Sequence, residues 1–161
     1  MDRPNELDER ARRVIDTNRY LTLGTTEPDH RPRLSPVYFT HVGYRDFYWV
    51  SSPAAHHSVN IAERPEVAIV IFDSTAPVGQ GQAVYVSATA AVVADEELPR
   101  RRAEAFNRVG PGAARAFAPH ELSGDADLRL YRAKATGHDL HVPGGDPVYG
   151  TGIDSRRPVT P

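Results

Sequence analysis

The fold is decided by residues 47–73, which read FYWVSSPAAHHSVNIAERPEVAIVIFD. The aromatic and β-branched residues at the start of this stretch predict a strand that continues to Ser52. Ser52 followed by Pro53 is the pattern of a helix start, because a hydroxyl caps the first turn and proline fits the first helical position. Residues 54–63 therefore predict a short helix, and the strand leads directly into its N-terminus.

Segments with the alternation or the length of strands lie on both sides of that helix. They are residues 20–26, 33–42, 66–74, 82–93, 128–137 and 138–142. The continuous apolar run of residues 66–74 predicts a strand that is buried on both faces. Residues 82–93 predict a second long strand beside it in the sheet.

Helices are predicted in three further regions. The first covers about residues 5–18, with Asn5 as its cap, and the second runs from about Asp95 to Gly110. A third, short helix is expected at residues 113–122. The last part of the chain, about residues 143–161, is too rich in Gly and Pro for regular structure.

The predicted elements are six or seven short strands, one intervening helix and a helical excursion, which is the pair of helices predicted between Asp95 and residue 122. This set is typical of a closed antiparallel β-barrel with helices at its ends. Strict alternation of strands and helices is absent, which argues against a doubly wound parallel sheet. The 161 residues fit one domain with one core. The expected architecture is therefore a mainly β barrel, a single domain over residues 1–161.

The composition excludes several classes of function. There are 19 Lys and Arg residues against 21 Asp and Glu residues, so the chain lacks the basic surface of nucleic-acid-binding domains. There is no cysteine, which excludes thiolate nucleophiles, Cys-ligated zinc and iron–sulfur clusters. No apolar run has the length of a signal peptide or a membrane span, so we expect a cytoplasmic protein that does not bind membranes.

Two further sequence patterns resemble known binding motifs but lack the neighbouring residues or the spacing that those motifs require. Gly79-Gln80-Gly81 begins like a dinucleotide-binding loop, but no third glycine follows and the next segment is a strand. The pairs His56-His57 and His138-x-x-His141 do not have the spacing of a metalloprotease helix. Alternation along a strand would also turn His138 and His141 to opposite faces. No metal site is expected.

The helix start after Ser52 offers an anion-binding site, because its free backbone N–H groups and the helix dipole both favour negative charge. Hydroxyls and imidazoles around it could complete a phosphate site. They belong to Ser51, Ser52, His56, His57 and Ser58. The alternative is a simple N-cap by Ser52 with exposed histidines, since capped helices are far commoner than ligand sites.

Residues 18–73, NRYLTLGTTEPDHRPRLSPVYFTHVGYRDFYWVSSPAAHHSVNIAERPEVAIVIFD, combine these pieces in a fixed order. The order begins with an apolar strand, a turn and a strand that contains proline. An aromatic strand ending in serine follows, and then a helix start with an asparagine. Pro65-x-Val67 and a buried strand complete the order. In this order the chain resembles the pyridoxamine 5′-phosphate oxidase-like family of FMN-binding proteins, which includes deazaflavin-dependent reductases and some haem-handling members. The resemblance implies a split antiparallel β-barrel with Greek-key-like connections and peripheral helices.

The resemblance also implies a set of residues at the phosphate end of the cofactor. Ser51 corresponds to the hydroxyl residue that binds the FMN phosphate. His57 corresponds to the helix-start lysine that reaches the same phosphate, and His56 to the basic residue before it. Asn60 matches the asparagine of the family's motif.

At the ring end, the segment Pro36-Val37-Tyr38 corresponds to the residues that line the edge of the isoalloxazine ring. Ser35 stands where the oxidases of the vitamin pathway carry an arginine. Gln82 or Gln80 corresponds to a glutamine near the flavin ring. All of these residues are candidates for cofactor binding, and the sequence names no catalytic side chain.

The chain differs from the family's pattern at the positions where the family has basic residues. Histidine replaces the lysine and the residue before it, and Ser35 replaces an arginine, so the fixed positive charge is weaker because neutral imidazole predominates near pH 7. Arg33 or a basic group of a second subunit is the expected compensation. The C-terminal arginine and tryptophan of true pyridoxamine-phosphate oxidases are absent, since the only tryptophan is Trp49. The vitamin reaction is therefore not expected.

The resemblance implies a flavin-dependent oxidoreductase in which FMN carries the hydride to or from a small molecule. Two subunits would bind two cofactors at their interface, so a homodimer is expected. One alternative is a reductase that uses the 8-hydroxy-5-deazaflavin coenzyme, which the loss of the phosphate-binding Arg and Lys favours. Another is a module that binds flavin or haem without turnover, with His56, His57 or His138 as contacts. The tail after Pro143 either folds over the neighbouring subunit or is disordered.

Overall fold

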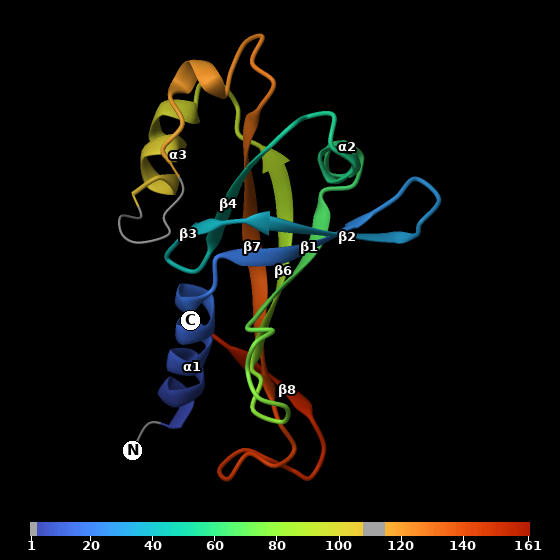
Figure 1. Cartoon of the computed structure of the whole chain (residues 1–161), viewed down its shortest axis with the longest axis vertical. Helices are drawn as coiled ribbons and strands as arrows, with labels where there is room; N and C mark the ends of the chain where they lie inside the picture. The colour runs from blue at the N-terminus through green and yellow to red at the C-terminus, as the bar shows by residue number, and fades with distance from the viewer. Residues whose placement is uncertain (1–2, 108–114) are drawn as a thin grey trace.

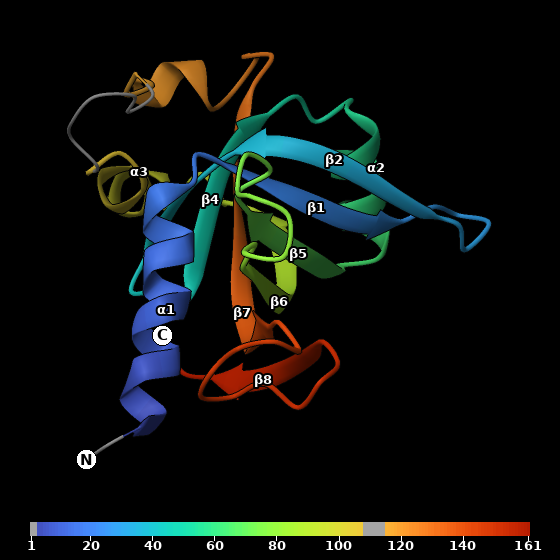
Figure 2. The same ribbon diagram turned by 60° about the horizontal axis from the view of Figure 1, so that its bottom comes forward.

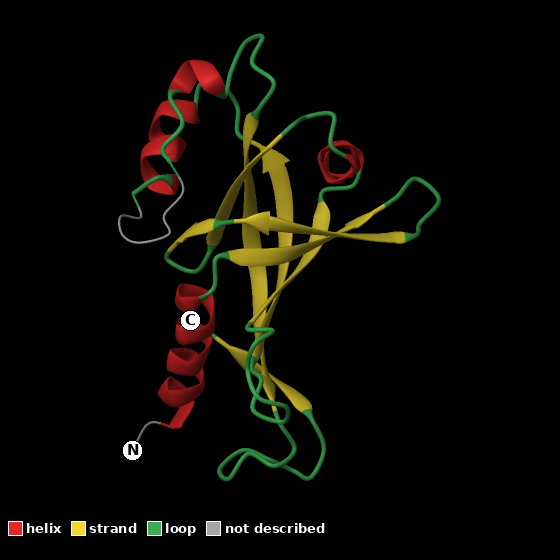
Figure 3. Cartoon of the chain, in the orientation of Figure 1, coloured by secondary structure: helices red, strands yellow, loops and turns green. Residues whose placement is uncertain are grey.

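The computed structural model describes residues 3–107 and 115–161. It shows a curled antiparallel sheet with helices at its periphery (Figures 1 and 3). The strands are β1 (Tyr20–Thr26), β2 (Pro32–Tyr38), β3 (Thr40–Val42), β4 (Asp46–Ser51), β5 (Glu66–Phe72), β6 (Ala83–Val92), β7 (Arg129–Val142) and β8 (Ser155–Val159). The helices are α1 (Arg3–Thr17), α2 (His56–Glu63) and α3 (Leu98–Ala105), with a short 3₁₀ helix at Pro119–Glu121. The predicted mainly β split barrel is confirmed.

The sheet curls into a barrel because one segment, residues 32–42, forms both of its edges. The strand order is β2-β1-β5-β6-β7-β4-β3, and β8 pairs with β7 outside this path. β2 pairs with β1 and β3 pairs with β4, yet only Phe39 separates β2 from β3. The prediction of one unbroken strand over residues 33–42 is therefore wrong. Phe39 is fully buried, and its N–H donates to the carbonyl of Arg19 at 3.1 Å, one residue beyond the last β1–β2 pair and in the same register.

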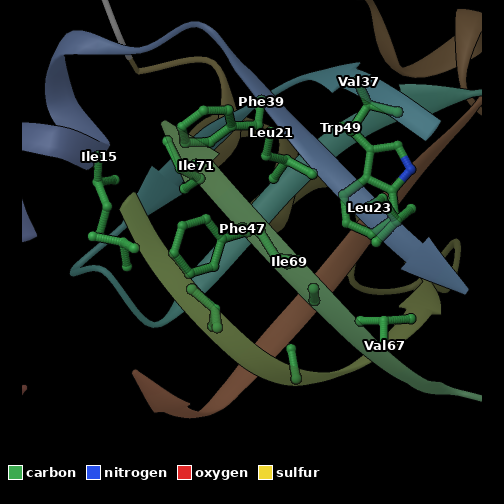
Figure 4. Close-up of a cluster of buried hydrophobic side chains, with 14 of the residues drawn as sticks. Ile15, Leu21, Leu23, Val37, Phe39, Phe47, Trp49, Val67, Ile69 and Ile71 are labelled. Atoms are coloured by element: carbon green, nitrogen blue, oxygen red, sulfur yellow. The ribbon is translucent and has the colours of Figure 1, made fainter. Parts of the chain in front are cut away.

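Large apolar side chains from the strands and α1 fill the interior of the barrel, among them Ile15, Leu21, Phe39, Phe47 and Ile69 (Figure 4). Burial alternates along β5, so its odd-numbered positions face this core and its even-numbered positions face outward. The prediction of burial on both faces is wrong, because no layer of helices covers the outer face of this strand as it would in a parallel sheet.

A second, smaller cluster packs α3 against the outer face of β4 and β7. Its buried members are Tyr48, Val93, Leu98, Ala105, Leu122 and Leu130. The helical excursion is shorter than the sequence pattern predicts. α3 ends at Ala105, and Gly110 lies outside the described residues. Of the expected helix 113–122, residues 115–122 are described, and within them only Pro119–Glu121 is helical.

Two other boundaries differ from the prediction. α1 begins at Arg3, so Asn5 lies inside the helix and does not cap it. Residues 129–142 form one long strand where two were expected, because β6, β4 and β8 together provide partners along its whole length. The register shifts between Ser87 and Ala88 of β6, because β7 carries one extra residue, Thr136, between their partners Gly137 and Ala135.

The C-terminal tail folds onto its own chain, with β8 paired to β7 and the C-terminus lying against α1 (Figure 2). The N–H of Thr160 donates to Asp8 Oδ1 at 2.7 Å. Asp146 Oδ2 accepts from the Arg10 guanidinium at 2.7 Å, and Asp146 Oδ1 accepts from the N–H groups of Val148 and Tyr149. Gly150 closes this loop, since a Cβ there would lie 2.4 Å from backbone oxygens. The expectation of an irregular tail is confirmed for residues 143–154 and is wrong for Ser155–Val159, which form β8.

Replacing Asp146 by Asn is expected to destabilise the fold by about 2 kcal/mol at pH 7, because the charged acceptor of these three bonds is lost. These bonds lower the pKa of Asp146 from its ordinary value to about 2. A depressed carboxyl pKa stabilises the fold above the unfolded-state value near 4, and that contribution disappears as the pH falls toward about 2. Urea unfolding of both proteins at several pH values should show the difference shrinking in that window. Asp29→Asn, at an exposed pair with Arg31, is the control and should change little.

No helix in the described ranges is both long enough and apolar enough to cross a lipid bilayer.

Candidate functional site

The centre of the site is a hydrogen bond between Ser51, the last residue of β4, and His57, in the first turn of α2. Ser51 Oγ and His57 Nε2 are 2.7 Å apart. The turn between them is held by Ser52, whose Oγ accepts from the N–H of Ala54 at 3.1 Å. The sequence pattern correctly brought Ser51 and His57 to one place, at the junction of a strand and a helix.

The start of α2 differs from the predicted one. The helix begins at His56 with Ala55 as its N-cap residue, and no side-chain hydrogen bond caps it. The predicted cap by Ser52 is therefore wrong, because its hydroxyl is used in the turn before the helix begins. The N-terminus of α2 keeps its dipole without a capping side chain.

Burial lowers the pKa of His57 below its ordinary value, and burial is its only cause. The imidazole is therefore predominantly neutral at pH 7 in the absence of a ligand. A neutral imidazole bonded to a hydroxyl is a polar pair without fixed charge.

This pair lies at the edge of a cavity of about 440 Å³. The wall comes from β2, β4, the start of α2, the start of β7 and the excursion after α3. The lining residues are Pro36, Val37, Tyr38, Thr40, Tyr48, Trp49, Val50, Ser51, His57, Phe106, Phe117, Leu128 and Leu130. This lining is mostly aromatic and aliphatic, and the described residues in it include no Lys or Arg, which suits a planar apolar ligand with one polar end.

A charged network fixes the α3 side of the cavity. The Tyr48 hydroxyl donates to Glu104 Oε2 at 3.1 Å and lies 3.4 Å from an Arg101 nitrogen. Burial raises the pKa of Tyr48. The rings of Phe106 and Phe117 lie 5.9 Å apart and add an apolar wall next to this network.

The cavity lies in a region of sequence with recognisable relatives. The profile of the family described as pyridoxamine 5′-phosphate oxidase matches residues 7–137. The chain belongs to this family. No curated protein matches the sequence.

Three solved structures illustrate the fold of the family. A haem-binding protein from Mycobacterium smegmatis has a TM-score of 0.70 at 21% identity and covers 98% of this chain, which spans only 60% of that protein. The haem storage protein HutZ from Vibrio cholerae has a TM-score of 0.58 at 19% identity, covering 86% of this chain and 95% of its own. An F420 reductase has a TM-score of 0.51 at 15% identity, covering 78% and 93%. These likenesses show a shared fold.

Two further candidate residues, one from the family's motif and one from the helix start, do not line the cavity. Asn60 is buried, and its Nδ2 donates to Thr25 Oγ1 at 3.1 Å, so it ties α2 to β1. Ser58 is also buried, and its Oγ has no hydrogen-bond partner within the described part of the chain.

Arg33 and His56 lie together in a second, polar hollow of about 640 Å³ at the β1–β2 hairpin. Arg33 Nε donates to Glu27 Oε1, and His56 Nδ1 lies 3.8 Å from the same oxygen. The interaction with Arg33 lowers the pKa of Glu27, which therefore stays charged. The structure thus pairs Arg33 with a carboxylate and does not bring it to His57.

The remaining candidates are dispersed. Ser35 lies in β2 opposite Leu23 and is not in the cavity wall. Gln82 lines a separate hollow of about 430 Å³ with Phe72 and Tyr85, and Gln80 lies in the turn before it. His138 Nε2–H donates to the Tyr44 carbonyl oxygen at 2.7 Å, whereas His141 lies near Asp154.

No set of three or more His, Asp or Glu side chains within residues 3–107 and 115–161 could hold a metal ion. Sequence reasoning missed the far wall of the cavity, which includes Phe106, Phe117 and Leu128. One signal was available, because Phe106 and Phe117 are the only Phe, Tyr or Trp residues between residues 98 and 128. Their position beside Ser51 depends on how the excursion folds back.

Proposed function

We propose that this protein is a flavin-dependent oxidoreductase that binds FMN, with the phosphate at Ser51 and His57 and the ring in the aromatic cavity. The observation that carries the proposal is the Ser51–His57 pair at the edge of a mostly apolar cavity, in a chain of this family. A hydroxyl, an imidazole and an uncapped helix N-terminus suit a phosphate. Aromatic and aliphatic walls suit a planar ring system.

When bound, the flavin would supply hydride transfer to or from a small molecule. The chain's own residues bind and orient it. Ser51 and His57 would hold the phosphate end, and the cavity residues Pro36, Val37 and Tyr38, with Phe106 and Phe117, would contact the ring and exclude water from it. No side chain has to act as a nucleophile.

A homodimer is part of this proposal, and the outer face of the sheet supports it. Two rows of outward residues cross β2, β1, β5 and β6 in register without a charged group. They are Leu34, Gly24, Ala68 and Ser87, and Pro36, Thr22, Val70 and Tyr85. The Arg156 guanidinium lies 3.5 Å from the centre of the Tyr85 ring, and the remaining side chains of the two rows form an uncharged strip that is typical of a surface that a second copy covers.

Sedimentation of the protein is expected to give the mass of two chains of 17.7 kDa each. Ala68→Arg places a charge at the centre of the uncharged face, where the residue is exposed, and should release monomers without unfolding them. Glu66→Arg, an exposed change on the same strand outside those two rows, is the control. A monomeric wild-type protein would contradict the dimer.

A reductase that uses the 8-hydroxy-5-deazaflavin coenzyme is the second candidate. The specific observation that favours it is the absence of Lys and Arg from the described cavity wall, where an FMN phosphate dianion would need compensation. One structural relative is an F420 reductase.

Equilibrium binding of the cofactor-free protein to FMN, FAD, the deazaflavin coenzyme and haem, under one set of conditions, tests the proposal. We expect selective binding of FMN, followed by reduction of the bound flavin by a nicotinamide or chemical reductant and its reoxidation by an acceptor. Selective binding of the deazaflavin supports the second candidate. Selective binding of haem, or a bound flavin that does not cycle, contradicts an oxidoreductase.

A further inference from the structure

We infer that the Ser51–His57 pair takes up one proton when it binds a phosphate, so that the affinity of this protein for a phosphorylated cofactor falls as the pH rises. The inference rests on the proposed FMN site and adds to it the charge state in which that site binds. It follows from the geometry of the pair, from its protons and from the charges around it.

The pair offers more to an anion when His57 is charged. With a neutral ring, the pair has one ring N–H and one hydroxyl proton, and the 2.7 Å bond between the two side chains uses one of them. One donor and one lone pair then face outward. With a charged ring, Nε2–H donates to Ser51 Oγ, which leaves Nδ1–H and the hydroxyl proton as two outward donors beside a positive charge.

No fixed cation on the strands packed against α2 replaces this charge. α2 packs on β1, β2 and β6, and the only charged residue in these three strands is Arg33. Arg33 is paired with Glu27, as is the neighbouring imidazole of His56. On α2 and at its end, Glu63 lies outside the cavity wall and Arg64 donates to the carbonyl of Thr26 at 2.7 Å.

The strands on the other side of the pair do not supply a free cation either. On β7, Arg129 stands opposite Ser51 in register, but its guanidinium donates to the carbonyls of Ala126, Leu128 and Gly124. On β4, the distant Asp46 is paired with Arg132. Burial raises the pKa of the Tyr48 phenol, which is therefore neutral near pH 7. Within the described residues of this chain, His57 is therefore the member of the pair that can add a positive charge toward a bound phosphate.

The direction of the pH dependence follows from these groups. Burial holds the pKa of unliganded His57 below its ordinary value, whereas a bound phosphate would raise it. At pH values between the pKa of His57 in the free protein and its pKa in the complex, the complex carries one more proton than the free protein and free FMN together. The dissociation constant for FMN therefore rises about tenfold for each pH unit. Riboflavin has the same ring and no phosphate, so its affinity should not depend on pH in this way.

Calorimetric titration of the cofactor-free full chain with FMN and with riboflavin tests this inference. Measurements from about pH 6.5 to 8.5 keep the phosphate mostly dianionic, because its second pKa is about 6. Two buffers of different ionisation enthalpy give the number of protons taken up. We expect about one proton for FMN with a rising dissociation constant, and neither effect for riboflavin.

The variant His57→Lys keeps a cation at all of these pH values and should bind FMN with little pH dependence and no proton uptake. Tighter binding of FMN than of riboflavin, but without pH dependence or proton uptake in the wild type, would overturn this inference and leave the proposed function intact. Equal affinities for FMN and riboflavin would overturn the inference, because they would show that the phosphate does not contact the Ser51–His57 pair. If neither ligand binds, the proposed function itself fails.

Discussion

Substitution of His57 by Glu is expected to lower the affinity for FMN by about 100-fold or more, because like charges brought together in a partly buried site cost several kcal/mol. The carboxylate would stand next to Ser51 Oγ, where the structure has an imidazole nitrogen at 2.7 Å. Fluorescence or calorimetric titration with FMN measures the effect. Riboflavin should lose much less affinity, since it has no phosphate for the new charge to repel.

His56→Glu is the matched control. It makes the same change one residue earlier, on a side chain that is 71% exposed and lies outside the cavity wall. We expect less than a tenfold loss of FMN affinity, because water screens an exposed charge. An equal loss in both variants would mean that the phosphate responds to the general charge of this region. An unchanged affinity in His57→Glu would place the phosphate elsewhere.

Substitution of Phe39 by Ala is expected to destabilise the protein by about 3–5 kcal/mol, the usual cost of removing a buried aromatic ring. Phe39 has no exposed surface and its ring lies 6.0 Å from that of Phe47. It also separates β2 from β3, which contribute Tyr38 and Thr40 to the cavity wall. Urea unfolding followed by circular dichroism measures the loss, and FMN affinity should fall with it.

Phe39→Leu keeps most of the volume and should cost about 1–1.5 kcal/mol. Because the ring mainly fills space, the leucine variant is expected to retain FMN binding. A destabilisation of Phe39→Ala below about 1 kcal/mol would contradict the importance of this residue for closing the barrel.

The sequence was most informative where local pattern and tertiary environment agree. Alternation predicted β1 at residues 20–26 with its observed bounds, and the aromatic run at residues 47–50 predicted β4. The junction from Ser51 to His57 was also predicted, because a strand end, a turn and a helix start lie within a few residues of one another.

Features that depend on distant partners could not be predicted in this way. The tail strand β8 has a sequence with proline and arginine, SRRPV, and becomes a strand because β7 extends far enough to pair with it. The break at Phe39 depends on a change of partner from β1 to β4. The cavity wall at Phe117 depends on the folding back of a segment whose local pattern wrongly indicated a longer helix.

The separation of the two hydrophobic clusters has a consequence for how this protein can diverge. The barrel cluster and the cluster under α3 share no residue, yet both contribute side chains to the same cavity. Mutations at Phe106 or Phe117 can therefore alter which molecules are accepted while the barrel core remains intact. Residues of this excursion can therefore be substituted, in evolution or in directed selection in the laboratory, without changing the barrel.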